Sequence, residues 1–179
     1  MSVTSVTHKR ALGHFRNMLN AEGFKVNVVP GGSVAPYDAL VIQMEAPDED
    51  GPSWQIEISY LPFMEEQLEE VSILQFFAPL SVGIAENVEN ELNWLITRIN
   101  TKLPLVGFGF LEEGKVVYFK HNAMVVNNDQ TGNYKQVREI INMIGFLVGN
   151  FRSALHAVAN GEKPGREALS GNPFEQLYL

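Results

Sequence analysis

The apolar residues of this chain recur at two different spacings, and each spacing predicts one kind of secondary structure. Apolar positions three and four residues apart indicate one buried face of a helix, whereas strict alternation indicates a half-buried strand. Helical spacing is clearest over residues 86–103, which end before Pro104. Alternation is clearest over residues 54–61, where polar residues separate Trp54, Ile56, Ile58 and Tyr60. The chain therefore combines helical and strand segments.

These patterns predict an α+β fold with an antiparallel sheet of about five to six strands flanked by helices, in the order α-β-β-β-β-α-β-β-α. Strands joined by short connections favour antiparallel pairing, because parallel pairs need long crossovers. Helices are expected over 7–22, 86–103 and 133–160, and strands over 24–29, 37–45, 54–61, 71–77, 105–111 and 116–126.

Proline, glycine and polar residues set the expected limits of these elements. Pro79 is expected to end the strand over 71–77, because proline cannot donate to a sheet ladder. A bulge is expected at 121–122, where a polar pair interrupts an apolar strand. We expect a single domain over residues 1–160 and a C-terminal tail over 161–179, which opens with the helix breakers Gly161, Pro164 and Gly165.

The helix expected over 133–160 is more apolar than a helix with one buried face. On a wheel of about 100° per residue, its apolar side chains span roughly 220°, about twice the usual stripe. Either the helix lies in a groove between the sheet and a second helix, or part of this arc meets another subunit. Glycine in the helix would let a neighbouring backbone approach closely. The candidate partner-binding residues are therefore Met143, Gly145, Phe146 and Gly149.

Composition narrows the classes of partner. The chain has 13 Lys and Arg against 21 Asp and Glu, a formal net charge of −8, which disfavours a nucleic-acid partner. No window is apolar enough to span a membrane, and the N-terminus lacks signal-peptide features, so we expect a cytoplasmic protein without a membrane partner. The solvated face of the first helix is expected to hold the one basic cluster, which comprises His8, Lys9, Arg10, His14 and Arg16.

The motifs contain no constellation typical of catalysis or cofactor binding. Residues 109–115 match the G-x-x-x-x-G-K opening of a P-loop, but Val116 replaces the hydroxyl residue, and Glu112 and Glu113 would repel phosphates. The histidines lack metal-ligand spacing, and no G-x-S-x-G elbow is present. The chain has no cysteine, which excludes thiolate chemistry. We therefore expect no catalytic, metal-binding or cofactor-binding residue, and a non-enzymatic protein.

A family resemblance rests mostly on the second half of the chain. It is carried by the helix at 88–103, the segment 104–110 with the Glu-Glu-Gly turn, the strand at 116–119 and the long helix around 138–158. Together these resemble the type III secretion chaperone-like fold, and particularly the YbjN family of small bacterial domains. The resemblance implies dimerisation through a helix and a sheet face. For the secretion chaperones, it also implies binding of extended segments along apolar grooves.

These observations lead to two hypotheses of function. The first is a non-enzymatic protein-binding or chaperone-like module that acts as a homodimer and contacts a protein or peptide partner. The alternative is a small-molecule-binding regulatory domain with a pocket between the sheet and the helices. That alternative requires an enclosed cavity with converging polar groups, for which the candidates are Arg138, Arg152 and His156.

Overall fold

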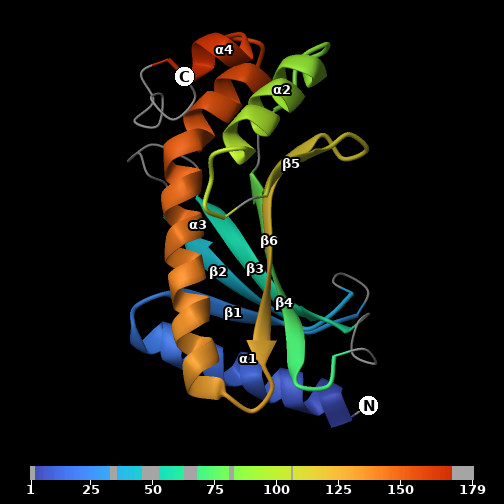
Figure 1. Ribbon diagram of the computed structural model, residues 1–179, viewed down its shortest axis with the longest axis vertical. Helices are drawn as coiled ribbons and strands as arrows, with labels where there is room; N and C mark the ends of the chain where they lie inside the picture. Colours follow the sequence, from blue (N-terminus) through green and yellow to red (C-terminus); the bar gives the residue numbers. More distant parts are fainter. Residues whose placement is uncertain are drawn as a thin grey trace.

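Six antiparallel strands form one sheet in the order β1-β2-β3-β4-β6-β5 (Figure 1). The computed structural model describes residues 3–32, 36–45, 53–62, 68–80, 83–105 and 107–170. The strands are β1 (Lys25–Val29), β2 (Ala39–Met44), β3 (Trp54–Leu61), β4 (Val71–Leu80), β5 (Phe108–Leu111) and β6 (Val116–Val126). The helices are α1 (Val3–Ala21), α2 (Glu89–Asn100), α3 (Gln130–Ala159) and α4 (Gly165–Ala168). The predicted α+β class and antiparallel sheet are confirmed.

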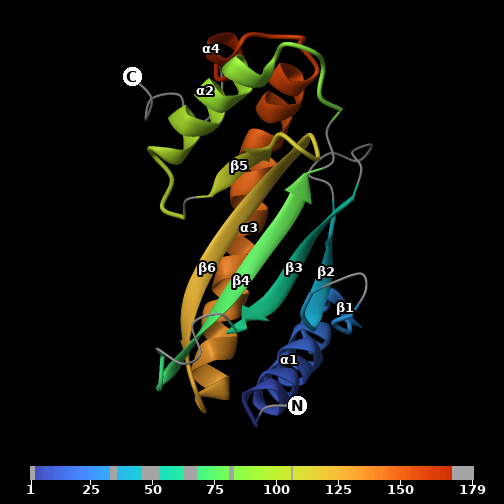
Figure 2. The same ribbon diagram turned by 90° about the vertical axis from the view of Figure 1, so that its right-hand side faces the viewer.

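Alternation along the strands gives the sheet two different faces. In β3 and β4, every second residue is buried and its neighbours are half-buried. The buried face packs against helices and includes Leu40, Ile42, Ile58, Phe76, Val117 and Phe119. We call the opposite side the open face; it consists of the odd-numbered residues of β2, β3 and β4 and the even-numbered residues of β6. Figure 2 looks onto this face, with α3 behind the strands and no described helix in front.

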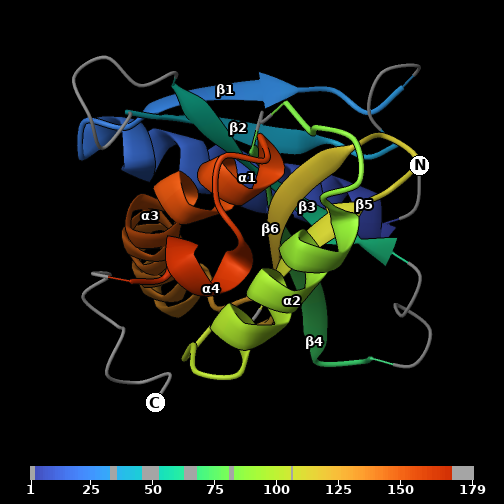
Figure 3. The ribbon, with the colours of Figure 1, turned by 90° about the horizontal axis from the view of Figure 1, so that it is seen from above.

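Helix α3 runs along the buried face, α1 crosses near one end, and α2 and α4 lie over the other end (Figures 1 and 3). The sheet and the other helices together enclose most of the apolar arc of α3, including Ile141, Ile144, Val148, Phe151 and Leu155. A groove within the chain's own fold therefore accounts for most of this arc. Two of its large apolar side chains, Met143 and Phe146, remain 36% and 53% exposed. None of the described helices is long and apolar enough to cross a membrane.

Two local expectations in the sheet were wrong. The pairing of β4 with β6 runs without a break from Val71 opposite Val126 to Leu80 opposite Val117, so no bulge occurs at His121. His121 stays on the buried face, where desolvation lowers its pKa. Pro79 lies inside β4 and does not end it, because the pairing of β4 with β3 already stops at Phe77. A proline is tolerated in a strand where one side needs no ladder hydrogen bond.

The segment after α3 folds back onto α2. The backbone N–H of Gly165 donates a hydrogen bond to Glu91 Oε2 at 2.8 Å, and the Arg166 guanidinium lies 5.7 Å from the centroid of the Trp94 ring. Leu169 is buried in the same contact. The sequence pattern predicted only a polar tail here. It missed α4 because this helix is a single turn that is stabilised by its contacts with α2.

At Gly107, the backbone of the segment before β5 lies close to the backbone of β6. The Gly107 carbonyl accepts a hydrogen bond from the N–H of Lys120 at 2.7 Å, and a Cβ added to Gly107 would overlap the Lys120 carbonyl. Only glycine fits this approach without displacing the strand. The contact holds the segment before β5 against the sheet.

We expect Gly107→Ala to lower the free energy of unfolding by about 1–3 kcal/mol, because the new methyl group forces the two backbones apart. Gly13→Ala is the control, since a Cβ at Gly13 in α1 meets nothing within 4 Å. Alanine favours a helix by about 1 kcal/mol over glycine, so the control should be neutral or stabilising. Urea unfolding measures both; equal stabilities for the two variants would contradict the close approach.

Candidate functional site

A groove of about 490 Å³ lies between the end of α1, the strands β1 and β2, and the middle of α3. Phe24, Met44 and Trp54 contribute its apolar lining, and Gly145 and Gly149 form its α3 side. A Cβ on Gly145 would stand 3.2 Å from the terminal methyl of Met44. Because glycine has no side chain, the two glycines keep this side of the groove open.

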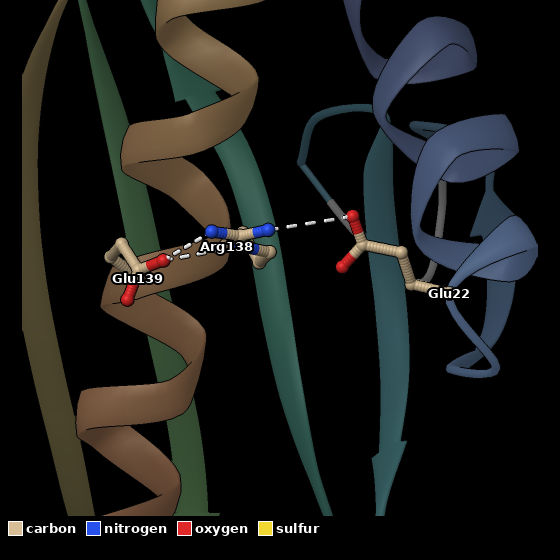
Figure 4. Close-up of polar contacts among 3 residues, drawn as sticks. All are labelled: Glu22, Arg138 and Glu139. Atoms are coloured by element: carbon tan, nitrogen blue, oxygen red, sulfur yellow. Dashed lines mark hydrogen bonds and ion pairs between the residues drawn. The ribbon is translucent and has the colours of Figure 1, made fainter.

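Charged residues surround the apolar lining. Glu22, Lys25 and Glu45 also line the groove. Arg138 of α3 lies near Glu22 of the segment after α1, with Nη1 3.7 Å from Glu22 Oε1, while its Nη2 donates to Glu139 Oε1 at 2.6 Å (Figure 4). The hydrogen bond to Glu139 and the charges of both carboxylates raise the pKa of Arg138. These side chains are more than one third exposed, so solvent screening leaves the pairs a small effect on stability.

The structure separates the four candidate partner-binding residues into two sets. Gly145 and Gly149 line the groove, whereas Phe146 and Met143 are exposed on the solvent side of the helix. We call the exposed pair, Met143 and Phe146, the α3 outer surface. At about 100° per residue, Phe146 lies roughly 60° from Gly149 and roughly 60° from Met143 on the other side. The α3 outer surface is therefore adjacent to the groove but distinct from it.

The polar groups expected to converge in a pocket do not do so. Neither Arg138, Arg152 nor His156 is among the groove-lining residues within the described part of the chain. Arg152 is buried elsewhere along α3, and the His156 ring contacts the Asn160 side chain at 3.1 Å. The groove is thus an apolar surface with an acidic and basic rim, without a converging set of arginine and histidine.

A second polar site, the His8 cluster, consists of His8, Tyr60, Ser72 and Asn127. The His8 ring stacks on the Tyr60 ring with centroids 3.9 Å apart and an angle of 3° between the planes. His8 Nε2 lies 3.0 Å from Ser72 Oγ, and Ser72 Oγ donates to Asn127 Oδ1 at 2.8 Å. A cavity of about 40 Å³ adjoins His8 and Tyr60.

The direction of these hydrogen bonds decides what the His8 cluster can do. Asn127 Nδ2 donates to the Glu69 carbonyl at 3.3 Å, which orients the amide and leaves Oδ1 to accept from Ser72. Since the Ser72 hydroxyl hydrogen points at Asn127, His8 Nε2 must donate its own N–H to Ser72 Oγ. A general base needs a bare nitrogen facing the hydroxyl. The pair therefore satisfies buried polar groups and does not activate Ser72 as a nucleophile.

Sequence reasoning missed the His8 cluster. Lys9, Arg10 and Arg16 are exposed as expected, but His8 and His14 are half-buried. His8 precedes Leu12 by four positions, so helical spacing alone places it on the buried stripe of α1. The basic neighbours of His8 in the sequence obscured this signal.

Two buried tyrosines remain neutral across the physiological range. Burial raises the pKa of Tyr60, in the His8 cluster, to about 12. Burial also raises the pKa of Tyr134 to about 12, with a further contribution from the negative charge of Glu22. In the part of the chain that the structure describes, no three His, Asp or Glu side chains gather as metal ligands.

The chain matched no protein-family model, no curated protein and no solved structure. The resemblance to the type III secretion chaperone-like fold and the YbjN family therefore stays a prediction.

We expect Ser72→Ala to lower the free energy of unfolding by about 1–3 kcal/mol, because it leaves His8 Nε2 and Asn127 Oδ1 without this partner in a buried site. Ser153→Ala on the exposed side of α3 is the control and should change stability by less than about 0.5 kcal/mol. Thermal and urea unfolding measure both variants. A Ser72→Ala protein as stable as the control would show that the cluster contributes nothing to the fold.

Proposed function

We propose that this chain is a non-enzymatic protein-binding module, chaperone-like in its use of apolar surface, that acts as a homodimer. A partner segment with an apolar side chain lies on the α3 outer surface and continues into the adjacent groove. The observation that carries this proposal is the 53% exposure of Phe146 beside a groove lined by Phe24, Met44 and Trp54. Phenylalanine is among the residues enriched at the centres of protein interfaces.

The size of the α3 outer surface fits a short segment. Burying the exposed half of one aromatic side chain removes roughly 100 Å² from water, which contributes about 2.5 kcal/mol before ordering costs. A stable protein interface buries about 800 Å² per partner, so Met143 and Phe146 cannot by themselves hold a dimer together. They are suited to anchor one or two side chains of an extended or helical segment.

The charges of the groove indicate which segments bind. Glu22 and Glu45 outnumber Lys25 among the charged lining residues, and the chain as a whole has a net charge of −8. A segment with apolar residues flanked by lysine or arginine therefore complements this site better than an acidic one.

We expect Phe146→Glu to weaken binding of such peptides by tenfold or more, because it removes the apolar anchor and puts a hydrated carboxylate where the apolar side chain of the peptide has to pack. Fluorescence anisotropy with labelled peptides that contain aromatic residues and flanking lysines measures the affinity. Ser153→Glu adds the same charge two helical turns away and should preserve binding. No binding by the wild type, or equal loss in both variants, would refute a site on the α3 outer surface.

The second candidate function is binding of a small molecule in the groove. The observation that favours it is the volume of about 490 Å³, within the range of roughly 300–1,000 Å³ typical of ligand sites. Such a ligand would place an apolar part against Trp54 and a cationic group near Glu22 or Glu45.

The groove candidate predicts that Gly145→Leu fills the space and reduces binding of the uncharged apolar probe Nile red at least fivefold. Gly13→Leu on α1, where a Cβ meets nothing within 4 Å, should leave binding unchanged. The probe's fluorescence and the shift of Trp54 emission measure occupancy. Unchanged binding to the Gly145→Leu protein would exclude the groove as the site.

A further inference from the structure

The open face of the sheet is short of charge and carries exposed and half-buried apolar side chains. Among its residues, as defined above, only Glu57 and Lys120 are charged, although charged residues make up 19% of the chain. Met124 and Val126 are 66% and 51% exposed on this face. Depletion of charge around apolar and aromatic residues is typical of the central part of an interface.

An aromatic pair lies on this face towards the β5 side. The rings of Phe77 on β4 and Tyr118 on β6 are tilted against each other with centroids 5.5 Å apart. Tyr118 also covers Gly109 of β5, since a Cβ on that glycine would overlap the tyrosine ring. The pair thus forms a continuous aromatic surface across β4 and β6.

The strand register places side chains of matching character at equal distances on either side of β4. Each row across the sheet takes one residue from β3, one from β4 and one from β6. The rows are Leu61–Ile73–Met124, Ser59–Gln75–Asn122 and Glu57–Phe77–Lys120. Within each row, the flanking residues lie about 5 Å from the central strand. In each row, the residues of β3 and β6 match in character. Both are apolar in the first row, both are polar in the second, and the third row has an acid on β3 and a base on β6.

This arrangement is complementary to itself about a two-fold axis that runs along β4 between two stacked sheets. Such an axis exchanges the β3 and β6 sides, so Glu57 of one copy faces Lys120 of the other, and the reverse contact occurs as well. The same operation places Leu61 opposite Met124 and Ser59 opposite Asn122, while Phe77 meets its own equivalent. The usual crossing of about −30° between packed sheets keeps these contacts closest near the axis.

The area of the open face approaches that of a standard interface. Four strands at about 4.8 Å spacing cover roughly 19 Å, and ten residues of β4 at about 3.4 Å extend roughly 34 Å. The projected area is therefore roughly 650 Å², and the side chains add to its accessible surface. A standard interface buries about 800 Å² per partner.

We infer that the partner on the open face is a second copy of this chain, packed sheet to sheet about this two-fold axis. This inference deepens the homodimer of the proposed function, on which it rests, and leaves the α3 outer surface free on the far side of each copy. The paired Glu57 and Lys120 contacts set the register of the two sheets. Gln55 Nε2 donates to Glu57 Oε1 at 2.9 Å and holds that carboxylate on the face.

Charge reversal tests both the face and the axis. Lys120→Glu places two carboxylates opposite each other on both sides of the axis, and Glu57→Lys places two ammonium groups there. Each variant alone should weaken dimerisation of the full chain by tenfold or more, measured by sedimentation equilibrium. An equimolar mixture of the two variants should restore dimers, because every contact across the axis is again between opposite charges. When one variant is labelled with nitrogen-15, native mass spectrometry identifies these dimers as mixed by their mass.

The controls separate this inference from the proposed function. Circular dichroism checks that each variant keeps its fold, and Lys102→Glu, which changes the same charge on an exposed residue after α2, should leave the dimer intact. A monomeric wild type, a dimer that survives both reversals, or a mixture that stays monomeric overturns the two-fold packing. The peptide affinity of the α3 outer surface is measured in the same variants and should be unchanged. Peptide binding by a dimer that survives both charge reversals refutes the inference alone, whereas a monomeric wild type also refutes the homodimer of the proposed function. A charge-sensitive dimer without peptide binding refutes only the site on α3.

Discussion

The structure depends on the packing of α3 against one face of the sheet. This helix of 30 residues contacts the sheet and each of the other helices, and Val148 and Phe151 within it are fully buried. Removal of this much apolar surface from water is the main term that offsets the entropy lost on folding. Because α1 and α3 both take the buried face, the remaining helices lie at one end of the sheet. The open face is the consequence of this one-sided arrangement.

A one-sided arrangement leaves two apolar surfaces on opposite sides of the molecule. The α3 outer surface projects away from the sheet and is bordered by a groove that Gly145 and Gly149 keep open. The open face projects the other way and is broad, with the polar residues of β3 and β6 at matching positions on either side of β4. A small convex surface beside a groove suits a segment of chain, whereas a broad face suits a second sheet. The two proposed interactions can therefore occur at once in the same molecule.

The points where sequence reasoning failed share one cause. The strand pattern around His121 and the proline at position 79 both suggested an interruption, yet the pairing of β4 with β6 is continuous. His8 was assigned to solvent from its basic neighbours, although it stacks on Tyr60 and contacts Ser72. In each case the decisive partner lies on another element, and only for His8 did helical spacing within α1 carry a local signal. The single turn of α4 was missed for the same reason, since it is stabilised by contacts with α2.

The sequence by itself determined the class of fold, the main elements and the unusual apolarity of α3, because periodicity depends only on residues close together in the chain. It also identified Met143, Gly145, Phe146 and Gly149 as an unusual set. The tertiary structure alone decided that the glycines line a groove while Phe146 meets solvent. It alone decided which face of the sheet is covered, since alternation marks two faces of a strand but does not say where the helices go. Those choices depend on contacts between residues distant in sequence.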